Sequence, residues 1–370
     1  MVGDWSPPRH HNVLHVGHNR RELRARAGIQ HFSPTYTVQK YTASDLAPIY
    51  RTISTPPRHW DSQTKCTMNY STADAFLSAP PPSFEMRERE PLLPFVSDKY
   101  LSLILTIVIY WGVSIFFHVI DTLDLLPKYR IHPPEEVSLR NKVTVLEVIR
   151  DVLLQQLIQT ITGIVLTYYD PPDYVGMEAR DIWVLAHKLP YLSLPVVSFL
   201  YYYGFSIMKI IAAFFVLDTW QYFVHRAMHN YKYLYRTFHS RHHRLYVPYA
   251  FGALYNHPFE GLVMDTLGAG LAFKLCGLTI RESLLFFSFS TLKTVDDHCG
   301  YALPFDPLQI IFQNNAAYHD IHHQQFGIKT NFSQPFFIVW DKWLGTQYKG
   351  NRNARDAAVT EKSEVEKKKK

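Results

Sequence analysis

His225-Arg-Ala-Met-His229 is the first of three histidine clusters that decide the fold of this chain, and His239-Ser-Arg-His242-His243 and His319-Asp-Ile-His322-His323 are the others. On a helix, positions i, i+3 and i+4 share one face, so each cluster can aim its imidazoles at a common point. One tetrahedral zinc ion takes about four ligands and would leave roughly half of these histidines unused. Two metals with roughly four or five nitrogens each would use the whole set. The spacing therefore predicts helices that bring the three clusters to one dimetal centre.

A histidine can also be a structural side chain, and we interpret the isolated His118, His132 and His187 in that way. This interpretation fails for the clustered histidines, because rings buried in an apolar setting are costly without partners. Imidazole binds iron, copper and zinc alike, so the clusters by themselves do not identify the metal.

Further candidate residues lie beside the clusters. His298 directly follows an apolar segment and is the predicted ninth ligand, whereas His257 precedes that segment and is either a ligand or a group that supports one. Carboxylates often hold the outer nitrogen of metal-bound imidazoles. Four acids are candidates for this role, with a solvated or helix-capping charge as the alternative for each: Asp218, Asp296, Asp297 and Asp320.

Four apolar segments predict helices in a membrane. Residues 100–120 carry no Asp, Glu, Lys or Arg and at about 1.5 Å per residue span roughly 30 Å, the hydrocarbon thickness of a bilayer. Residues 143–169 and 192–224 follow, and 261–292, interrupted by Arg281-Glu282, predict a helical hairpin whose arms are short for full spans. We therefore expect an all-α, multi-pass membrane helical bundle with a cytosolic-face helical cap that holds the histidine-ligated dimetal centre.

Loop charges orient this bundle. Segment 121–142 carries four Lys or Arg residues, whereas 170–190 is mainly acidic, so the positive-inside rule places 121–142 in the cytosol. Three crossings then return His225 to the cytosolic face, and the hairpin returns His298 and the third cluster to it. The Arg-rich N-terminus would be lumenal, which the rule disfavours, so either long tails escape the rule or one span is miscounted.

The two ends of the chain differ from this middle part. Residues 1–95 are rich in Ser, Thr and Pro without an apolar period and predict a poorly ordered tail. Four arginines between 20 and 26 resemble a transit peptide, and a solvated tail is the simpler interpretation. We expect transmembrane helices in 96–200, the histidine-bearing domain in 201–348 and a charged tail in 349–370. The last four lysines match a dilysine retrieval signal of the endoplasmic reticulum or form a solvated tail.

Composition excludes some classes of function. The net charge of +6 comes with Lys and Arg at both ends, and no basic stripe interleaves with aromatics, so we expect no nucleic-acid partner. The aromatic share of 15% suits helices that meet lipid. Three cysteines without a Cys-x-x-Cys pair make a disulfide framework implausible.

Longer stretches resemble the fatty acid hydroxylase superfamily of membrane di-iron proteins and, within it, the sphingolipid C4-hydroxylases, also called sphinganine hydroxylases. One is Asp218-Thr-Trp-Gln-Tyr-Phe-Val-His225. The others are 245–252, 293–304 and 314–331, with 117–122 and 129–133 upstream. The resemblance covers roughly residues 92–345 and leaves the N-terminal tail outside it.

The resemblance implies a site of two non-haem irons, with O2 as oxidant and electrons from NAD(P)H through cytochrome b5 and its reductase. It implies sphinganine or dihydroceramide as the lipid substrate, hydroxylated at carbon 4, and a multi-pass protein of the endoplasmic reticulum membrane. Lys293, Asp296 and Asp297 are then candidate polar contacts for the lipid head group. Imidazole sites also accept zinc, so zinc can replace iron in a structure.

Two other classes of function compete with this interpretation. A sterol desaturase, a sterol methyl oxidase or another fatty acid hydroxylase of the same superfamily would differ in substrate and product. A zinc-dependent membrane hydrolase or a non-catalytic metal-binding protein would differ in metal and would consume no oxygen.

Overall fold

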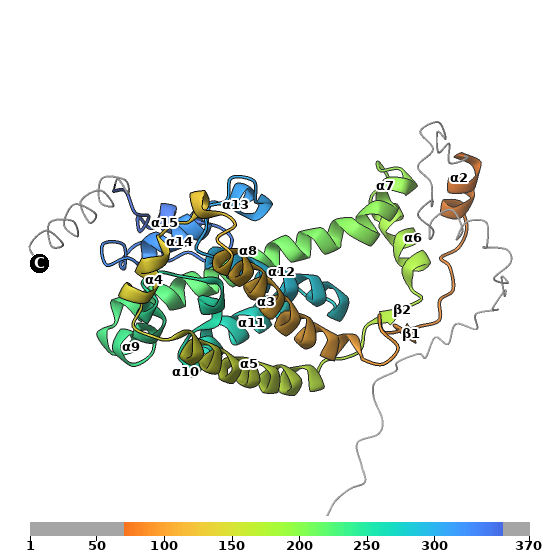
Figure 1. Ribbon diagram of the computed structural model, residues 1–370. Helices are drawn as coiled ribbons and strands as arrows, with labels where there is room; N and C mark the ends of the chain where they lie inside the picture. Colours follow the sequence, from red (N-terminus) through yellow and green to blue (C-terminus); the bar gives the residue numbers. More distant parts are fainter. Residues whose placement is uncertain (1–69, 351–370) are drawn as a thin grey trace, which may run out of the picture. The chain divides into compact units, whose positions relative to one another are not determined.

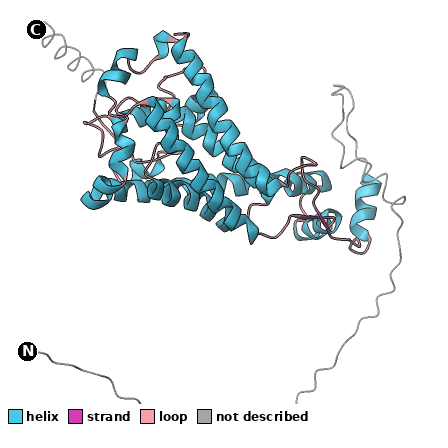
Figure 2. Ribbon diagram, turned by 60° about the horizontal axis from the view of Figure 1, so that its bottom comes forward, coloured by secondary structure: helices cyan, strands magenta, loops and turns pink. Residues whose placement is uncertain are grey.

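The computed structural model describes residues 70–350, which are mostly helical (Figure 2). Three of the described helices are long and apolar enough to cross a membrane. The first is α3 (Asp98–Thr122) and the second is α5 (Val145–Tyr168). The third is Leu194–Asn230, which comprises α7 (Leu194–Phe199), the π-helical turn η2 (Leu200–Gly204) and α8 (Phe205–Asn230) (Figure 1). The apolar segments predicted these three helices to within a few residues at most ends; α8 continues beyond 224 to carry the first histidine cluster.

The three long helices carry apolar side chains on faces that no other part of residues 70–350 covers. Only 22%, 33% and 11% of their most apolar windows are buried, in chain order. Val108 of α3, Leu157 of α5 and Met208 of α8 are each more than half exposed. Apolar surface of this extent is unfavourable in water and favourable against lipid tails. This part of the chain therefore has the surface of a membrane protein.

Two polar side chains of α3 point inward and are paired there. Tyr110 donates its hydroxyl hydrogen to the carbonyl of Phe251 at 2.6 Å, and Trp111 Nε1 donates to Gln156 Oε1 at 2.9 Å. Within a bilayer no water can satisfy such groups, so they must find partners inside the protein. These bonds attach α3 to α5 and to the short helix η4 (Ala250–Leu254), which follows the second histidine cluster.

The predicted hairpin is present. Its first arm is α10 (Pro258–Gly261), the π-helical turn η5 (Leu262–Leu267) and α11 (Gly268–Leu275), and its second arm is α12 (Ile280–Asp297). The chain reverses at Gly277, whose φ of 59° suits glycine. Thr279 and Glu282 then form a capping box, so Arg281-Glu282 begins α12 rather than breaking a helix. The hairpin packs on the long helices, with α12 against α3 and α11 against α8 (Figure 1).

Short helices gather around the histidine clusters and form the part of the chain that we call the cap. They are η1 (Pro127–Tyr129), α4 (Pro134–Arg140), α9 (Lys232–Thr237), η3 (His239–Arg244), η4, α13 (Pro307–Ile311), α14 (Ala316–His323) and α15 (Val339–Trp343). Ile131 N donates to Gly300 O, and Lys142 N donates to Arg244 O, both at 2.9 Å. The 121–142 segment therefore lies on the same side as the histidines, as the predicted helix order requires.

Residues 70–95 differ from the prediction of a poorly ordered tail up to 95. They contain α2 (Tyr70–Ser78) and β1 (Arg87–Glu88), which pairs antiparallel with β2 (Tyr174–Val175). Phe76 and Leu77 of α2 pack on Ile182 and Ala186 of α6 (Glu178–Lys188). The apolar cluster and the strand pair order a segment that has no long apolar period of its own. Most of the predicted N-terminal tail and nearly all of the C-terminal one, including the arginines at 20–26 and the final lysines, lie outside the described residues.

We expect Tyr110→Phe to destabilise the protein by about 1 kcal/mol, because the buried carbonyl of Phe251 loses its donor. Thermal unfolding of the detergent-solubilised protein measures this as a lower Tm. The matched control is Tyr100→Phe, since the Tyr100 side chain is 49% exposed. Equal Tm values for both variants would contradict the inward role of Tyr110.

Candidate metal centre

The nine histidines predicted as ligands gather in two adjoining groups. The five-histidine group contains His225, His229, His239, His243 and His322, and the four-histidine group contains His242, His298, His319 and His323. In each group one nitrogen per ring lies within 4.8 Å of those of the others, and every residue is buried. The arrangement has two positions where a metal ion can be surrounded by imidazole nitrogens.

Both His-x-x-His-His clusters divide their rings between the two groups. His239 and His243 belong to the five-histidine group and His242 to the other, whereas His319 and His323 belong to the four-histidine group and His322 to the first. The expectation that each cluster aims at one common point is therefore wrong. At 3.6 residues per turn, positions i and i+4 differ by about 40° around the helix, but i+3 and i+4 differ by about 100°. The second cluster is a 3-10 helix, η3, in which i and i+3 align, so this α-helical argument accounts for the division of the third cluster only.

The ring nitrogens face one another at ligand-like spacing. In the five-histidine group His239 Nε2 lies 3.1 Å from His225 Nε2 and 3.0 Å from His243 Nε2. In the four-histidine group His319 Nε2 lies 3.1 Å from both His298 Nε2 and His323 Nε2. Nitrogens about 2.1 Å from a shared metal are about 3.0 Å apart when their bonds to it are perpendicular. The spacing fits rings arranged around an ion.

Backbone carbonyls fix the protonation of five rings. The Nδ1 atoms of His225, His242, His298, His322 and His323 lie 2.7–3.1 Å from the carbonyl oxygens of Phe332, Tyr255, Thr294, Thr330 and Leu245, respectively. A carbonyl only accepts, so each Nδ1 must carry the hydrogen and Nε2 of the neutral ring keeps a lone pair. His322 Nε2 is buried without a hydrogen-bond partner among the described residues. A metal ion would satisfy it.

Burial keeps the rings neutral. It lowers the pKa of His239 to about 3, and burial together with neighbouring histidines lowers the pKa of His242 to about 4 and of His298 to about 3. The neutral ring is the form that binds a metal. Near neutral pH these rings therefore need no deprotonation before they can act as ligands.

The carboxylate that holds a ligand-group histidine was missed by the sequence analysis. Glu260, on α10, has Oε1 2.5 Å from His239 Nδ1, and both side chains are fully buried. Burial raises the pKa of Glu260 to about 7. The sequence contained one signal for this role: Glu260 is an acid at the start of the apolar hairpin, where an unpaired charge is costly, so it needs a partner.

The acids that were predicted for this role have other contacts. Asp218 accepts from the backbone N–H groups of Phe336 and Phe337 and so holds a loop of the cap. Asp320 pairs with His132 at 2.8 Å. Asp297 pairs with Lys293, and Asp296 accepts from Gln309. His257 lies in neither group, and its Nδ1 accepts from Phe259 N and caps α10.

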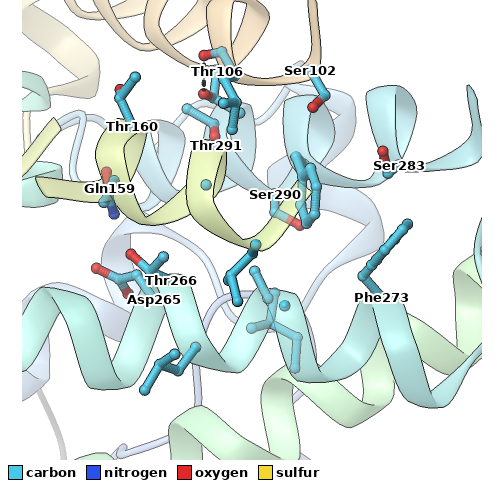
Figure 3. A pocket seen from close by; sticks show the side chains of 18 of the residues that line it. Ser102, Thr106, Gln159, Thr160, Asp265, Thr266, Phe273, Ser283, Ser290 and Thr291 are labelled. Carbon is cyan, nitrogen blue, oxygen red and sulfur yellow. Dashed lines mark hydrogen bonds between the residues drawn. The ribbon is translucent and has the colours of Figure 1, made fainter. Parts of the chain in front are cut away.

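A cavity of about 530 Å³ lies between α3, α5, α8 and the two arms of the hairpin (Figure 3). One end is one helical turn from both groups: Gln221 precedes His225 by four residues, and the carbonyl of Thr294 bonds His298. The other end has Lys99 and Lys274, which both bind Asp170. The walls between are mainly apolar. No histidine lines this cavity, and neither do Lys293, Asp296 or Asp297, the predicted head-group contacts.

The family model and the similar proteins named below indicate the same family. The fatty acid hydroxylase family model matches residues 210–346. The chain is 54% identical to the sphingolipid C4-hydroxylase SUR2 of Saccharomyces cerevisiae, over 73% of this chain and 77% of the relative. It is 45% identical to sphinganine C4-monooxygenase 1 of Arabidopsis thaliana, over 68% of this chain and 88% of the relative. A rice protein named very-long-chain aldehyde decarbonylase GL1-9 (Oryza sativa subsp. indica) is 44% identical, over 68% and 90%. No solved structure matches the chain significantly.

Metal-free protein should lose stability as the pH falls below 6.5. The pKa of His298 is about 3 in the fold against 6.5 for an ordinary ring, so below pH 6.5 the unfolded chain binds a proton that the fold does not. The free energy of unfolding therefore falls with pH, by about 2 kcal/mol for one such ring between pH 6.5 and 5. Thermal unfolding of chelator-treated protein at pH 7 and pH 5 measures the effect. An unchanged Tm would argue against neutral buried rings.

Proposed function

This chain belongs to the fatty acid hydroxylase family, among its sphingolipid C4-hydroxylases, and from that premise we propose that it hydroxylates carbon 4 of a sphingoid base. The observation that carries the proposal is the 54% identity to a C4-hydroxylase over 77% of that protein's length. The enzyme is an oxygen-dependent monooxygenase, and its product is the corresponding 4-hydroxy (phyto) base or ceramide.

The two histidine groups are proposed to bind two irons, with all nine rings as ligands. Three features support this assignment: the nitrogen spacing, the lone pairs that the backbone carbonyls direct inward, and the unpartnered His322 Nε2. When bound, such a pair supplies the activation of O2 that insertion of oxygen into an unactivated C–H bond requires. Zinc, which accepts the same ligands, remains a substitute that a purified sample can contain.

The protein holds the imidazole rings in place and shields the site from water. Glu260 and the backbone carbonyls keep the rings in one orientation, which costs no reorganisation when the reaction occurs. The buried clusters around the groups exclude water that would otherwise compete for the reactive site. The long apolar cavity accommodates the alkyl chain, with the reacting carbon at the end near Gln221 and Thr294.

We place the enzyme in the endoplasmic reticulum membrane, crossed by α3, α5 and the Leu194–Asn230 helix, with the cap on the cytosolic face. The four Lys and Arg residues of segment 121–142, which lies beside the histidines, support this orientation. Electrons are proposed to arrive from NAD(P)H through cytochrome b5 and its reductase, a proposal that rests on family membership alone.

A second candidate function has a specific observation behind it. The rice relative named as an aldehyde decarbonylase is as similar to this chain as the plant C4-monooxygenase is. A decarbonylase would convert a fatty aldehyde to a hydrocarbon and would leave the sphingoid bases unchanged. Lipid analysis therefore separates the two functions directly, and it also separates a sterol oxidase, whose substrate would be a sterol.

Expression in cells that lack 4-hydroxylated sphingolipids should restore them, as measured by mass spectrometry of extracted long-chain bases. His322→Ala should abolish the product and lower the iron content of the purified protein, because the five-histidine group loses one of its rings. His187→Ala is the matched control, since His187 is exposed on α6 and should leave product and metal unchanged. Normal product from His322→Ala would refute the ligand assignment, and hydrocarbon without 4-hydroxy bases would favour the decarbonylase.

A further inference from the structure

The chemistry of the proposed reaction restricts where the lipid head group can bind. Carbon 4 of a sphingoid base is two bonds from the carbon that carries the amine, so the amine must lie near the metals when carbon 4 does. The head group therefore belongs at the end of the cavity marked by Gln221 and Thr294, and the alkyl chain extends toward Lys99 and Lys274. This deduction rests on the proposed function.

One carboxylate lines the cavity at that end. Asp265 lies on the π-helical turn η5, and Figure 3 shows it beside Thr266 and facing Gln159, at the opposite end from Phe273 and Ser283. Gln221 Nε2 donates to Asp265 Oδ1 at 3.1 Å. Gln221 precedes His225 by one turn of α8, about 6 Å along the axis. The distance from this carboxylate to the five-histidine group is therefore comparable to the length of a sphingoid head group.

Contacts from α8 fix the position of Asp265. A π-helical turn interrupts regular helix geometry, and such turns occur often at functional sites. Trp220 Nε1 donates to the carbonyl of Val263 within this turn at 2.9 Å, and its ring packs so closely on Gly268 that a Cβ there would lie 2.5 Å from it. Two consecutive residues of α8, Trp220 and Gln221, thus hold the turn and orient its carboxylate.

Asp265 has no cationic partner among the described residues. Its contacts are the amides of Gln221 and Asn256, and the two lysines that line the same cavity are both bound to Asp170 at the far end. Burial and the nearby Glu260 raise the pKa of Asp265 to about 7. A carboxylate accepts up to about four hydrogen bonds, so two donors leave it capacity for a cation.

Two buried amides beside η5, neither of which lines the cavity, also have unpaired atoms. Asn256 Oδ1 is buried without a hydrogen-bond partner in the described structure. Gln155, fully buried on α5 one turn before Gln159, has neither amide atom paired among the residues described, and it packs directly over Gly261. A sphingoid head group brings an ammonium and two hydroxyls, which are donors. The unpaired atoms beside η5 are thus two acceptors, Asn256 Oδ1 and Gln155 Oε1, and one donor, Gln155 Nε2.

We propose that Asp265 is the residue that selects the substrate's head group, by binding the ammonium of a free long-chain base. An N-acylated base has no charge to offer this carboxylate and gains only neutral hydrogen bonds. The enzyme accordingly prefers sphinganine to dihydroceramide, and the preference depends on the charge of Asp265. Charged hydrogen bonds in buried sites are the stronger kind.

Asp265→Asn tests this assignment, because it keeps the shape and removes the charge. Holoenzyme in membranes is assayed with sphinganine and with N-acetylsphinganine, and the ratio of the two kcat/KM values is compared with that of wild type. We expect the preference for sphinganine to fall at least about tenfold, mainly through KM. Asp74→Asn, an exposed acid on α2 that does not line the cavity, is the matched control and should leave the ratio unchanged. An unchanged ratio in Asp265→Asn would overturn the proposal.

Equilibrium binding keeps the test independent of turnover. Radiolabelled octadecylamine should bind the detergent-solubilised wild type and Asp74→Asn equally, and bind Asp265→Asn at least about tenfold more weakly. On wild type alone, unlabelled octadecylamine should compete at lower concentration than N-octadecylacetamide. Equal competition by amine and amide would overturn the role of Asp265 even if the variant fails to fold. If wild type binds the amine selectively but forms no 4-hydroxy product, the reaction assignment fails and the ammonium site remains.

Discussion

The structure depends on the direction of imidazole lone pairs inside a space closed to water. Five rings give their Nδ1 hydrogen to backbone carbonyls that come from separate parts of the cap, such as Phe332, Tyr255 and Leu245. Each of these bonds ties the orientation of a ring to the path of the chain elsewhere. The cap therefore cannot rearrange locally without turning a ring away, and the loops that follow α14 are as necessary to the centre as the helices that carry the histidines.

The membrane imposes a second condition, and the polar contacts of the long helices show how it is met. Tyr110 and Trp111 project from an apolar helix yet reach a carbonyl and an amide, while the faces that carry Val108 and Met208 stay apolar. Because lipid offers no hydrogen bonds, these few inward contacts determine which face of each helix meets the others. They also attach the helices to η4, so the cap and the apolar helices are joined by specific bonds.

Much of this arrangement could be predicted from the sequence, where the signal is repetitive. Long apolar segments with few charges predicted the three long helices, and the interruption at Arg281-Glu282 predicted the hairpin. Histidine spacing predicted eight of the nine residues that cluster and the need for two positions, and His298 was predicted from its place directly after the apolar segment. The division of each His-x-x-His-His between the groups was not predicted, because it depends on where the second group lies in space. Glu260 and Asp265 were missed for the same reason: a single acid in an apolar run has a meaning only when its neighbour across the fold is known. Residues 70–95 are ordered by contacts with α6, about a hundred residues away, which no local pattern reports.

The reciprocal division of the two clusters has a thermodynamic consequence. η3 and α14 each supply rings to both positions, so an ion at either position fixes both segments and thereby arranges part of the other position. On the proposed assignment, any ordering that the first ion imposes on these segments would not be needed again for the second, so occupancy of the two positions would be cooperative. A chain loaded with a single ion would then be a poorly populated species, and the centre would assemble nearly in one step from empty to full.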